Sequence, residues 1–179
     1  MTRYVALLRG VNVGATRLAM ADLRRIVSDL GHEDVTTYLQ SGNVAFSSSV
    51  RDAEALAAGI GRALTDELAL TVPVLVRSGR ELAAVAGGNP YADREDDPTR
   101  LLVAFLATAP KTSLVDALAV PGAENVSFTV TGREVFLHYV DGGYGRSKFT
   151  NAYLEKKLGV AATSRNWKSV RALAEMTAS

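Results

Sequence analysis

Basic, hydroxyl and amide side chains gather in one glycine-rich segment of the sequence, DGGYGRSKFTNAYLEKKLGVAATSRNWKSV (residues 141–170). Residues 144–171, which end one residue after this segment, carry seven basic side chains and one acidic side chain. Their net charge is +6, whereas the total for the chain is +1. A local excess of this kind favours an anionic partner. We therefore expect this segment to bind a nucleotide, a nucleic acid or a phosphorylated small molecule.

The chemistry of that site would come from a helix expected to start near Ser147. The first backbone N–H groups of a helix lack intrahelical acceptors, so they can bind an anion. Lys148 would add a positive charge, and Arg165 a planar guanidinium suited to phosphate or carboxylate. The spacing of a Walker A loop, G-x-x-x-x-G-K-[ST], is absent. The predicted ligand-binding residues, which include amides of the first half that would recognise hydroxyls or a base edge, are Arg9, Asn12, Gln40, Ser41, Asn43, Arg146, Ser147, Lys148, Thr150, Asn151, Arg165 and Asn166.

Each of these residues also has a purely structural interpretation. Ser147 and Asn166 are residue types that cap helix N-termini, and Gly159 is typical of a helix C-terminus. The basic side chains would then form a solvated surface. Trp167 has helical spacing with Val170, which is more typical of a core position than of a stacking platform. The sequence leaves the binding and structural interpretations open.

Catalytic and metal-binding patterns are weak. The chain has no cysteine, which excludes disulfides, thiolate zinc sites and thiol catalysis. His32 and His138 have no third ligand near them in the sequence, so we expect neither a metal nor another cofactor. The acidic run DREDD (residues 93–97) could hold Mg²⁺, but an exposed, metal-free linker is the simpler expectation. No set of acid, base and nucleophile is evident, and enzyme activity stays undecided.

The elements that must position these residues follow from hydropathy and turn signals. The first half reads as a buried strand, an amphipathic helix, two strands joined by the turn QSGN, a second helix and a strand containing Pro73. Proline cannot donate to a sheet ladder, so this last strand should lie at a sheet edge. The expected order is β-α-β-β-α-β, the ferredoxin-like unit.

The same order returns after a short helix and a linker rich in glycine, proline and charge. The second half reads as a strand, a helix, a hairpin turning at TGR, a helix from Ser147 to Gly159, a short strand at about 160–163 and a final helix from Asn166. The predicted fold is α+β, with two tandem ferredoxin-like subdomains containing antiparallel sheets and an added C-terminal helix. The expected domains are residues 1–78, a helix and linker at 79–99, and residues 100–179.

Three motifs carry a resemblance that spans nearly the whole chain: LLRGVNVG, YLQSGNVAF and GRSKFTNAYLEKKLGVAATSRNW. Together they resemble the bacterial domain-of-unknown-function family 1697. The resemblance implies an α+β fold of duplicated ferredoxin-like halves. It implies no activity.

Topology predicts which motifs meet. In a β-α-β-β-α-β unit, the loop after the first strand and the hairpin between the second and third strands lie at the same end. RGVNVG and QSGN should therefore be neighbours, and so should GYGRSK and TSRNW at the opposite end of the second half. If those ends face each other, they would form one cleft between the subdomains.

The leading functional hypothesis is a cytoplasmic protein that binds an anionic ligand between its halves. The apolar run of residues 4–8 is too short for a signal sequence or a membrane span, and any protein partner is left open. One alternative is an enzyme acting on a small phosphorylated metabolite, with Lys148 and Arg165 as electrostatic stabilisers. Another is a structural or assembly module that pairs through its edge strands.

Overall fold

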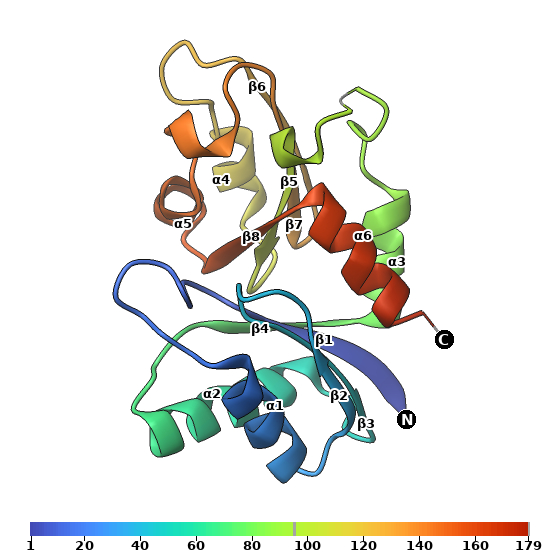
Figure 1. Ribbon diagram of the computed structural model, residues 1–179. Coiled ribbons are helices and arrows are strands. Elements are labelled where there is room, and N and C mark those ends of the chain that lie inside the picture. The colour runs from blue at the N-terminus through green and yellow to red at the C-terminus, as the bar shows by residue number, and fades with distance from the viewer. Residues whose placement is uncertain (95, 179) are drawn as a thin grey trace. The chain divides into compact units, whose positions relative to one another are not determined.

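The computed structural model describes residues 1–94 and 96–178 and forms two compact units. Unit 1 consists of Met1–Ala84 together with Ala172–Ser179, and unit 2 consists of Val85–Arg171. Each unit contains one four-stranded antiparallel sheet with helices (Figure 1). The predicted α+β class is therefore confirmed.

Unit 1 has the predicted order of strands and helices. Its elements are β1 (Thr2–Leu8), α1 (Met20–Asp29), β2 (Glu33–Thr37), β3 (Asn43–Ser48), α2 (Ala53–Leu68), β4 (Val74–Ser78) and the start of α3 (Gly79–Gly87). The sheet order is β2-β3-β1-β4, so the apolar β1 is central and β4 lies at an edge. Pro73 immediately precedes β4, where its missing N–H breaks no pairing.

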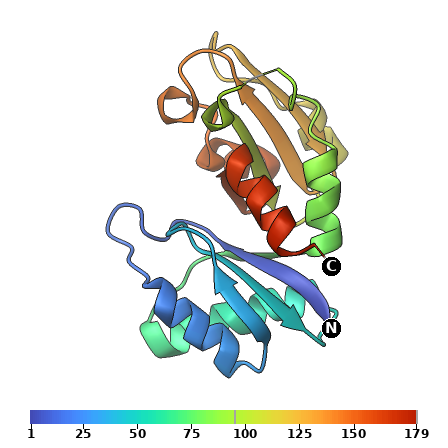
Figure 2. The same ribbon diagram turned by 45° about the vertical axis from the view of Figure 1, so that its right-hand side comes forward.

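The core of unit 1 forms because α1 and α2 each place an apolar stripe on the same face of this sheet. Leu23 and Ile26 of α1 and Ile60 of α2 are fully buried against β1 and β3. Both views show the two helices side by side under the strands (Figures 1 and 2). Asp52 caps α2 by accepting hydrogen bonds from the backbone N–H groups of Glu54 and Ala55.

Unit 2 repeats the order. Its elements are η1 (Pro98–Arg100), β5 (Leu101–Leu106), α4 (Thr112–Asp116), β6 (Val126–Thr131), β7 (Glu134–Tyr139), η2 (Tyr144–Arg146), α5 (Asn151–Leu158), β8 (Ala162–Asn166) and the start of α6 (Trp167–Met176). The sheet order β6-β7-β5-β8 has the same connectivity as the first sheet. Leu154 and Leu158 of α5 and Leu118, just after α4, pack on one face of this sheet. The prediction of two ferredoxin-like βαββαβ arrangements with an added C-terminal helix is thus confirmed.

Two boundaries differ from the sequence prediction. The helix expected from Ser147 begins at Asn151, because the Thr150 hydroxyl accepts a hydrogen bond from the Tyr153 N–H and caps it. The strand expected at about 160–163 is β8, which continues to Asn166 and pairs along β5. The sequence predicts a loop at the polar segment TSRN, but pairing with the buried strand β5 overrides the weak strand propensity of these residues.

The acidic linker is exposed where it is described. Asp93, Asp96 and Asp97 are exposed, as predicted, and Glu95 lies outside the described residues. Asp97 accepts hydrogen bonds from the N–H and hydroxyl of Thr99 and so caps η1. Within residues 1–94 and 96–178, no three histidine or acidic side chains are grouped to hold a metal ion.

In the same described part of the chain, no helix has the length and hydropathy needed to cross a bilayer.

Candidate functional site

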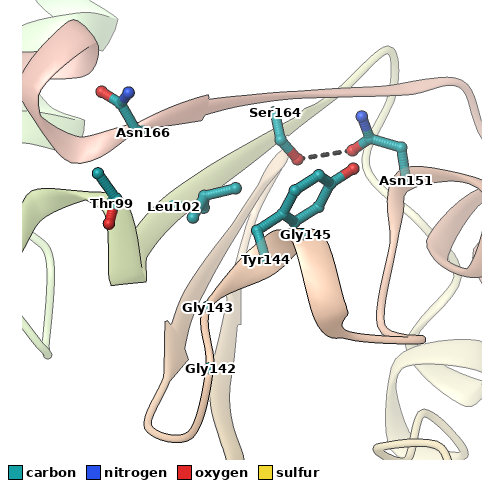
Figure 3. Close-up of a pocket in the computed structure, with 9 residues that line it drawn as sticks. All are labelled: Thr99, Leu102, Gly142, Gly143, Tyr144, Gly145, Asn151, Ser164 and Asn166. Carbon is teal, nitrogen blue, oxygen red and sulfur yellow. Dashed lines mark hydrogen bonds between the residues drawn. The ribbon is translucent and has the colours of Figure 1, made fainter.

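A pocket of about 450 Å³ lies in unit 2, at the end of the sheet where β5 begins and β8 ends (Figure 3). Five segments build it: η1, β5, the loop after β7, the first residue of α5, and β8. Its volume is in the range of small-molecule sites. The lining residues are Thr99, Leu102, Gly142, Gly143, Tyr144, Gly145, Asn151, Ser164 and Asn166.

The loop after β7 forms one wall and is named here the glycine loop (residues 142–145). Gly142 and Gly143 have φ angles of 86° and 74°, a region that side chains other than glycine rarely adopt. A Cβ atom on Gly142 would lie 3.4 Å from the Cδ atom of Arg146. The Arg146 side chain therefore runs beside the glycine loop, and the residue is exposed to solvent.

Tyr144 supplies the pocket's aromatic surface, and a second tyrosine holds it. The rings of Tyr144 and Tyr139 meet edge to face, with centroids 5.8 Å apart. Tyr139 is buried and donates a hydrogen bond of 2.7 Å to the Phe149 carbonyl. Burial raises the pKa of Tyr139 far above its ordinary value, so it stays a neutral donor.

Two amides in the pocket are fixed by hydrogen bonds. The Ser164 hydroxyl donates to Asn151 Oδ1 at 2.6 Å, which leaves the Asn151 amide nitrogen as a donor. Asn166 Oδ1 accepts from the Ser169 N–H and caps α6. From the viewpoint of Figure 3, Leu102 lies between the Tyr144 end and the Thr99 end of the pocket.

All nine lining residues are uncharged at neutral pH. Their hydroxyls and amides can exchange hydrogen bonds with a polar ligand, and the Tyr144 ring offers a face to a planar group. The exposed Arg146 side chain, which runs beside the glycine loop, carries a guanidinium suited to an anion. This arrangement suits a ligand with a polar, uncharged body and an anionic end.

The structure brings part of the predicted second-half set together. Asn151 and Asn166 line the same pocket, and the segments GYGRSK and TSRNW meet there as topology predicted. Ser147 and Lys148 are placed differently. The Ser147 hydroxyl and the Lys148 N–H both donate to the Glu124 carboxylate, the latter at 2.8 Å.

Glu124 therefore occupies the place that the sequence assigned to a bound anion. The Ser147 hydroxyl bond, followed by the Lys148 N–H bond and the Lys148 charge, lowers the pKa of Glu124 below its ordinary value. The expected helix N-terminus at Ser147 was wrong for the same physical reason, because these donors bind the Glu124 carboxylate instead of opening α5.

Arg165 does not line the pocket. Successive strand residues point to opposite faces, so Arg165 of β8 faces away from its pocket-lining neighbours Ser164 and Asn166. It is only 7% exposed and donates to the Thr163 hydroxyl at 2.8 Å and the Ser164 carbonyl at 2.9 Å. Burial lowers the pKa of Arg165 to about 10, which keeps it charged at pH 7. Neither Lys148 nor Arg165 lines this pocket, and their convergence on a site between the halves stays a prediction.

The first-half residues form the predicted neighbouring loops. Asn12 Nδ2 donates to the Gln40 carbonyl at 2.6 Å, and the Leu8 N–H donates to the Gly42 carbonyl at 2.8 Å. Asn43 is fully buried and donates to the Tyr38 carbonyl and the Ser41 hydroxyl. The Asn12 amide thus links the two loops, and the Asn43 amide holds the hairpin itself.

Arg9 follows β1 directly and is partly buried, and its N–H donates to the Pro73 carbonyl. A cleft that combines this end of unit 1 with the pocket of unit 2 stays a prediction.

Sequence reasoning missed four side chains of the pocket. Tyr144 and Ser164 lie inside the quoted glycine-rich segment, and the aromatic residue between glycines was the available signal for the first. Thr99 and Leu102 had no such signal, because they come from the end of a linker and the start of an ordinary apolar strand.

Comparisons with known proteins agree with this architecture. The conserved bacterial protein SP0830 from Streptococcus pneumoniae has a similar solved structure, with a TM-score of 0.78 and 22% sequence identity over 99% of both chains. At this identity, the likeness shows the fold alone. A search of curated proteins found no match. The family model "Protein of unknown function (DUF1697)" matches residues 1–136, which is most of the chain although it stops before the glycine loop. With this match and the duplicated fold, the chain belongs to the DUF1697 family.

Proposed function

We propose that this DUF1697 protein is a cytoplasmic binding protein for a phosphorylated ligand of nucleotide size, held in the pocket of unit 2. The observation that carries the proposal is the pocket itself, about 450 Å³ in volume and lined by hydroxyls, amides, a glycine loop and one aromatic ring. Sites for small ligands commonly combine such a cavity with a few well-placed polar groups.

Three contacts are expected in the complex. The Tyr144 ring stacks on the planar part of the ligand, and Asn151 Nδ2 donates to a carbonyl or ring nitrogen. Arg146, beside the glycine loop, binds the phosphate as a planar donor. This assignment differs from the sequence hypothesis, because Arg146 replaces Lys148 and Arg165 as the anion-binding group.

The enzyme alternative gains no support from these contacts. It assigned transition-state stabilisation to Lys148 and Arg165, and Arg165 is buried outside the pocket. Binding without chemistry is the simpler function for an uncharged lining.

Calorimetric titration with AMP, adenosine and inorganic phosphate tests the proposal. We expect AMP to bind best, because it alone combines a ring for Tyr144 with a phosphate for Arg146. Arg146→Ala should weaken AMP binding by roughly tenfold or more, since a hydrogen bond to a charged group contributes about 1.5–3 kcal/mol. Tyr144→Ala should weaken the binding of both AMP and adenosine.

Lys148→Ala is the matched control, since Lys148 is an exposed basic residue outside the lining set. It should leave AMP binding within twofold of the unaltered protein. The proposal is contradicted if no ligand at millimolar concentration gives a heat of binding or shifts the NMR resonances of backbone amides. A steep fall of affinity for single-stranded oligonucleotides with salt would instead identify nucleic acid as the partner.

A further inference from the structure

The outer strand of the unit 2 sheet, β6, has an unusually regular free edge. It pairs with β7 over all six residues without a register shift, and the sheet order leaves its other side unpaired among the strands described. The corresponding outer strand of unit 1, β2, has a register shift between Glu33 and Thr36 and carries two acidic residues. Irregularity and charge are the usual protection of an edge strand, and β6 has neither.

The backbone groups that face outward from β6 can be assigned. The Val140 N–H donates to the Asn125 carbonyl at 3.0 Å, and these residues form the next pair after Val126 and Tyr139 in the register. Hydrogen-bonded and non-hydrogen-bonded pairs alternate in an antiparallel ladder. The N–H and C=O groups of Val126, Phe128 and Val130 therefore point away from β7, toward the free side.

The same three residues carry the apolar side chains of β6. They pack against the core of unit 2 but are only partly buried. Their neighbours on β7, by contrast, are almost completely buried: Val135 is 0% and Leu137 is 1% exposed. The apolar face of the sheet thus reaches the edge and is only partly covered there.

The sequence of β6 indicates what would cover it. Residues 126–130 read V-S-F-T-V, which is symmetric in residue type about Phe128 and has no charge. Antiparallel pairing of two such strands about a twofold axis at Phe128 places Val126 opposite Val130 of the second copy. Phe128 then meets its own copy and exchanges both backbone hydrogen bonds with it, because its polar groups face outward.

We propose that the protein forms a homodimer in which β6 strands from two copies pair antiparallel about Phe128. The pairing joins two four-stranded sheets into one continuous sheet. Because the twofold axis is perpendicular to the sheet, apolar side chains of both copies stay on the same face. The dimer completes the burial of Val126, Phe128 and Val130.

Sedimentation velocity of the full chain over a micromolar concentration series tests the dimer. We expect a species with twice the mass of one chain. Val130→Pro should shift it to monomer, because proline removes an outward N–H donor while the bonds to β7 remain. Phe128→Lys is a second disruptive variant, since it brings two like charges together at the axis. Val35→Lys, at a partly buried position of β2, is the matched control and should leave the dimer intact.

Cross-linking tests the register. The chain has no cysteine, so Ser127→Cys introduces a single thiol. In the proposed pairing, two copies of residue 127 are diagonal neighbours about 7–8 Å apart, within reach of a short bismaleimide. Thr36→Cys on β2 is the control and should not cross-link.

A wild-type protein that stays monomeric at every concentration overturns the proposal. So does a dimer that persists in both folded β6 variants, or one that cross-links through Thr36→Cys and not through Ser127→Cys. Circular dichroism confirms that each variant is folded before its mass is interpreted.

Discussion

Arg165 has a structural role, although its residue type and its basic surroundings in the sequence suggested anion binding. In the sequence it is one of seven basic residues in a polar stretch, but the structure buries it in β8 opposite Val103. Arg77 is buried in the same way in β4, opposite Val5 of β1. In both strands, the guanidinium donates to the carbonyl of the preceding residue. The two units thus share a buried arginine at the end of their fourth strand.

We predict that Arg165→Ala destabilises the fold and leaves ligand binding to the folded protein unchanged. The substitution leaves the buried Thr163 hydroxyl and Ser164 carbonyl without their donor, at a cost of about 1–3 kcal/mol. Urea unfolding measures the change. The control is Lys168→Ala, at an exposed basic residue three positions after Arg165. It should alter the free energy of unfolding by no more than about 0.5 kcal/mol. Equal stabilities for the two variants would contradict the structural role.

Glu124 gives a prediction of pH dependence. Hydrogen bonds to its charged form lower its pKa in the folded state, so the stabilisation is present above the ordinary glutamate pKa. It is lost as the pH falls through the lower, folded-state pKa, when the carboxylate gains a proton. The Lys148 amide resonance should therefore titrate below the ordinary glutamate range in NMR spectra. In Glu124→Gln this titration should disappear, and an unchanged midpoint would show that another group is responsible.

Among the elements, the start of α3 is packed tightly against the chain's end within unit 1. A Cβ atom added to Gly79 would lie 2.4 Å from the Thr177 carbonyl oxygen, a backbone atom that cannot move aside easily. Thr177 is itself 2% exposed and donates to the Leu173 carbonyl. Only glycine allows this approach of the two segments.

We therefore predict opposite effects of two glycine-to-alanine substitutions. Gly79→Ala should destabilise the protein by about 1–3 kcal/mol, the usual cost of overpacking. Gly59→Ala is the matched control in α2, because an added Cβ there meets nothing within 4 Å. It should stabilise by up to about 1 kcal/mol through helix propensity. Thermal unfolding distinguishes the two outcomes, and a stabilising Gly79→Ala would disprove the close packing.

At the scale of the whole chain, unit 1 is completed by residues from both ends of the sequence. Ala172–Ser179 belongs to unit 1, although unit 2 separates it from Met1–Ala84 in the sequence. Arg3 Nη2 donates to the Met176 carbonyl at 3.2 Å, and Arg3 Nη1 donates to the Asp34 carbonyl at 3.1 Å. Arg3 thus links β1 to the last turn of α6 and to β2.

Arg3→Ala should loosen this link. We expect faster hydrogen exchange of the backbone amides in residues 172–178, because the last carbonyls of α6 lose a donor. Amides of β5 and β7 in unit 2 should keep their exchange rates. Arg51→Ala, an exposed arginine of unit 1, serves as the control. Unchanged exchange in residues 172–178 of Arg3→Ala would mean that packing alone holds this end.

The element order, the fold class and the edge position of β4 could all be predicted from the sequence. These features rest on local signals: hydropathy period, turn residues and the missing N–H of Pro73. The sequence also placed RGVNVG beside QSGN, because topology fixes which loops share an end of a sheet. These signals act over short stretches of chain, so they can be read without the partner segments.

Which polar residues line the pocket could not be predicted from the sequence, because it depends on long-range contacts. Arg165 was misplaced because pairing with β5 extends β8 through a polar stretch, and strand alternation then sets its face. Ser147 and Lys148 were misplaced because Glu124, more than twenty residues earlier, binds their donors. Thr99 enters the pocket from η1, and Leu102 enters it from β5. Each outcome depends on contacts between segments distant in the chain, and hydrogen bonding and burial there outweigh the local preference of any one residue.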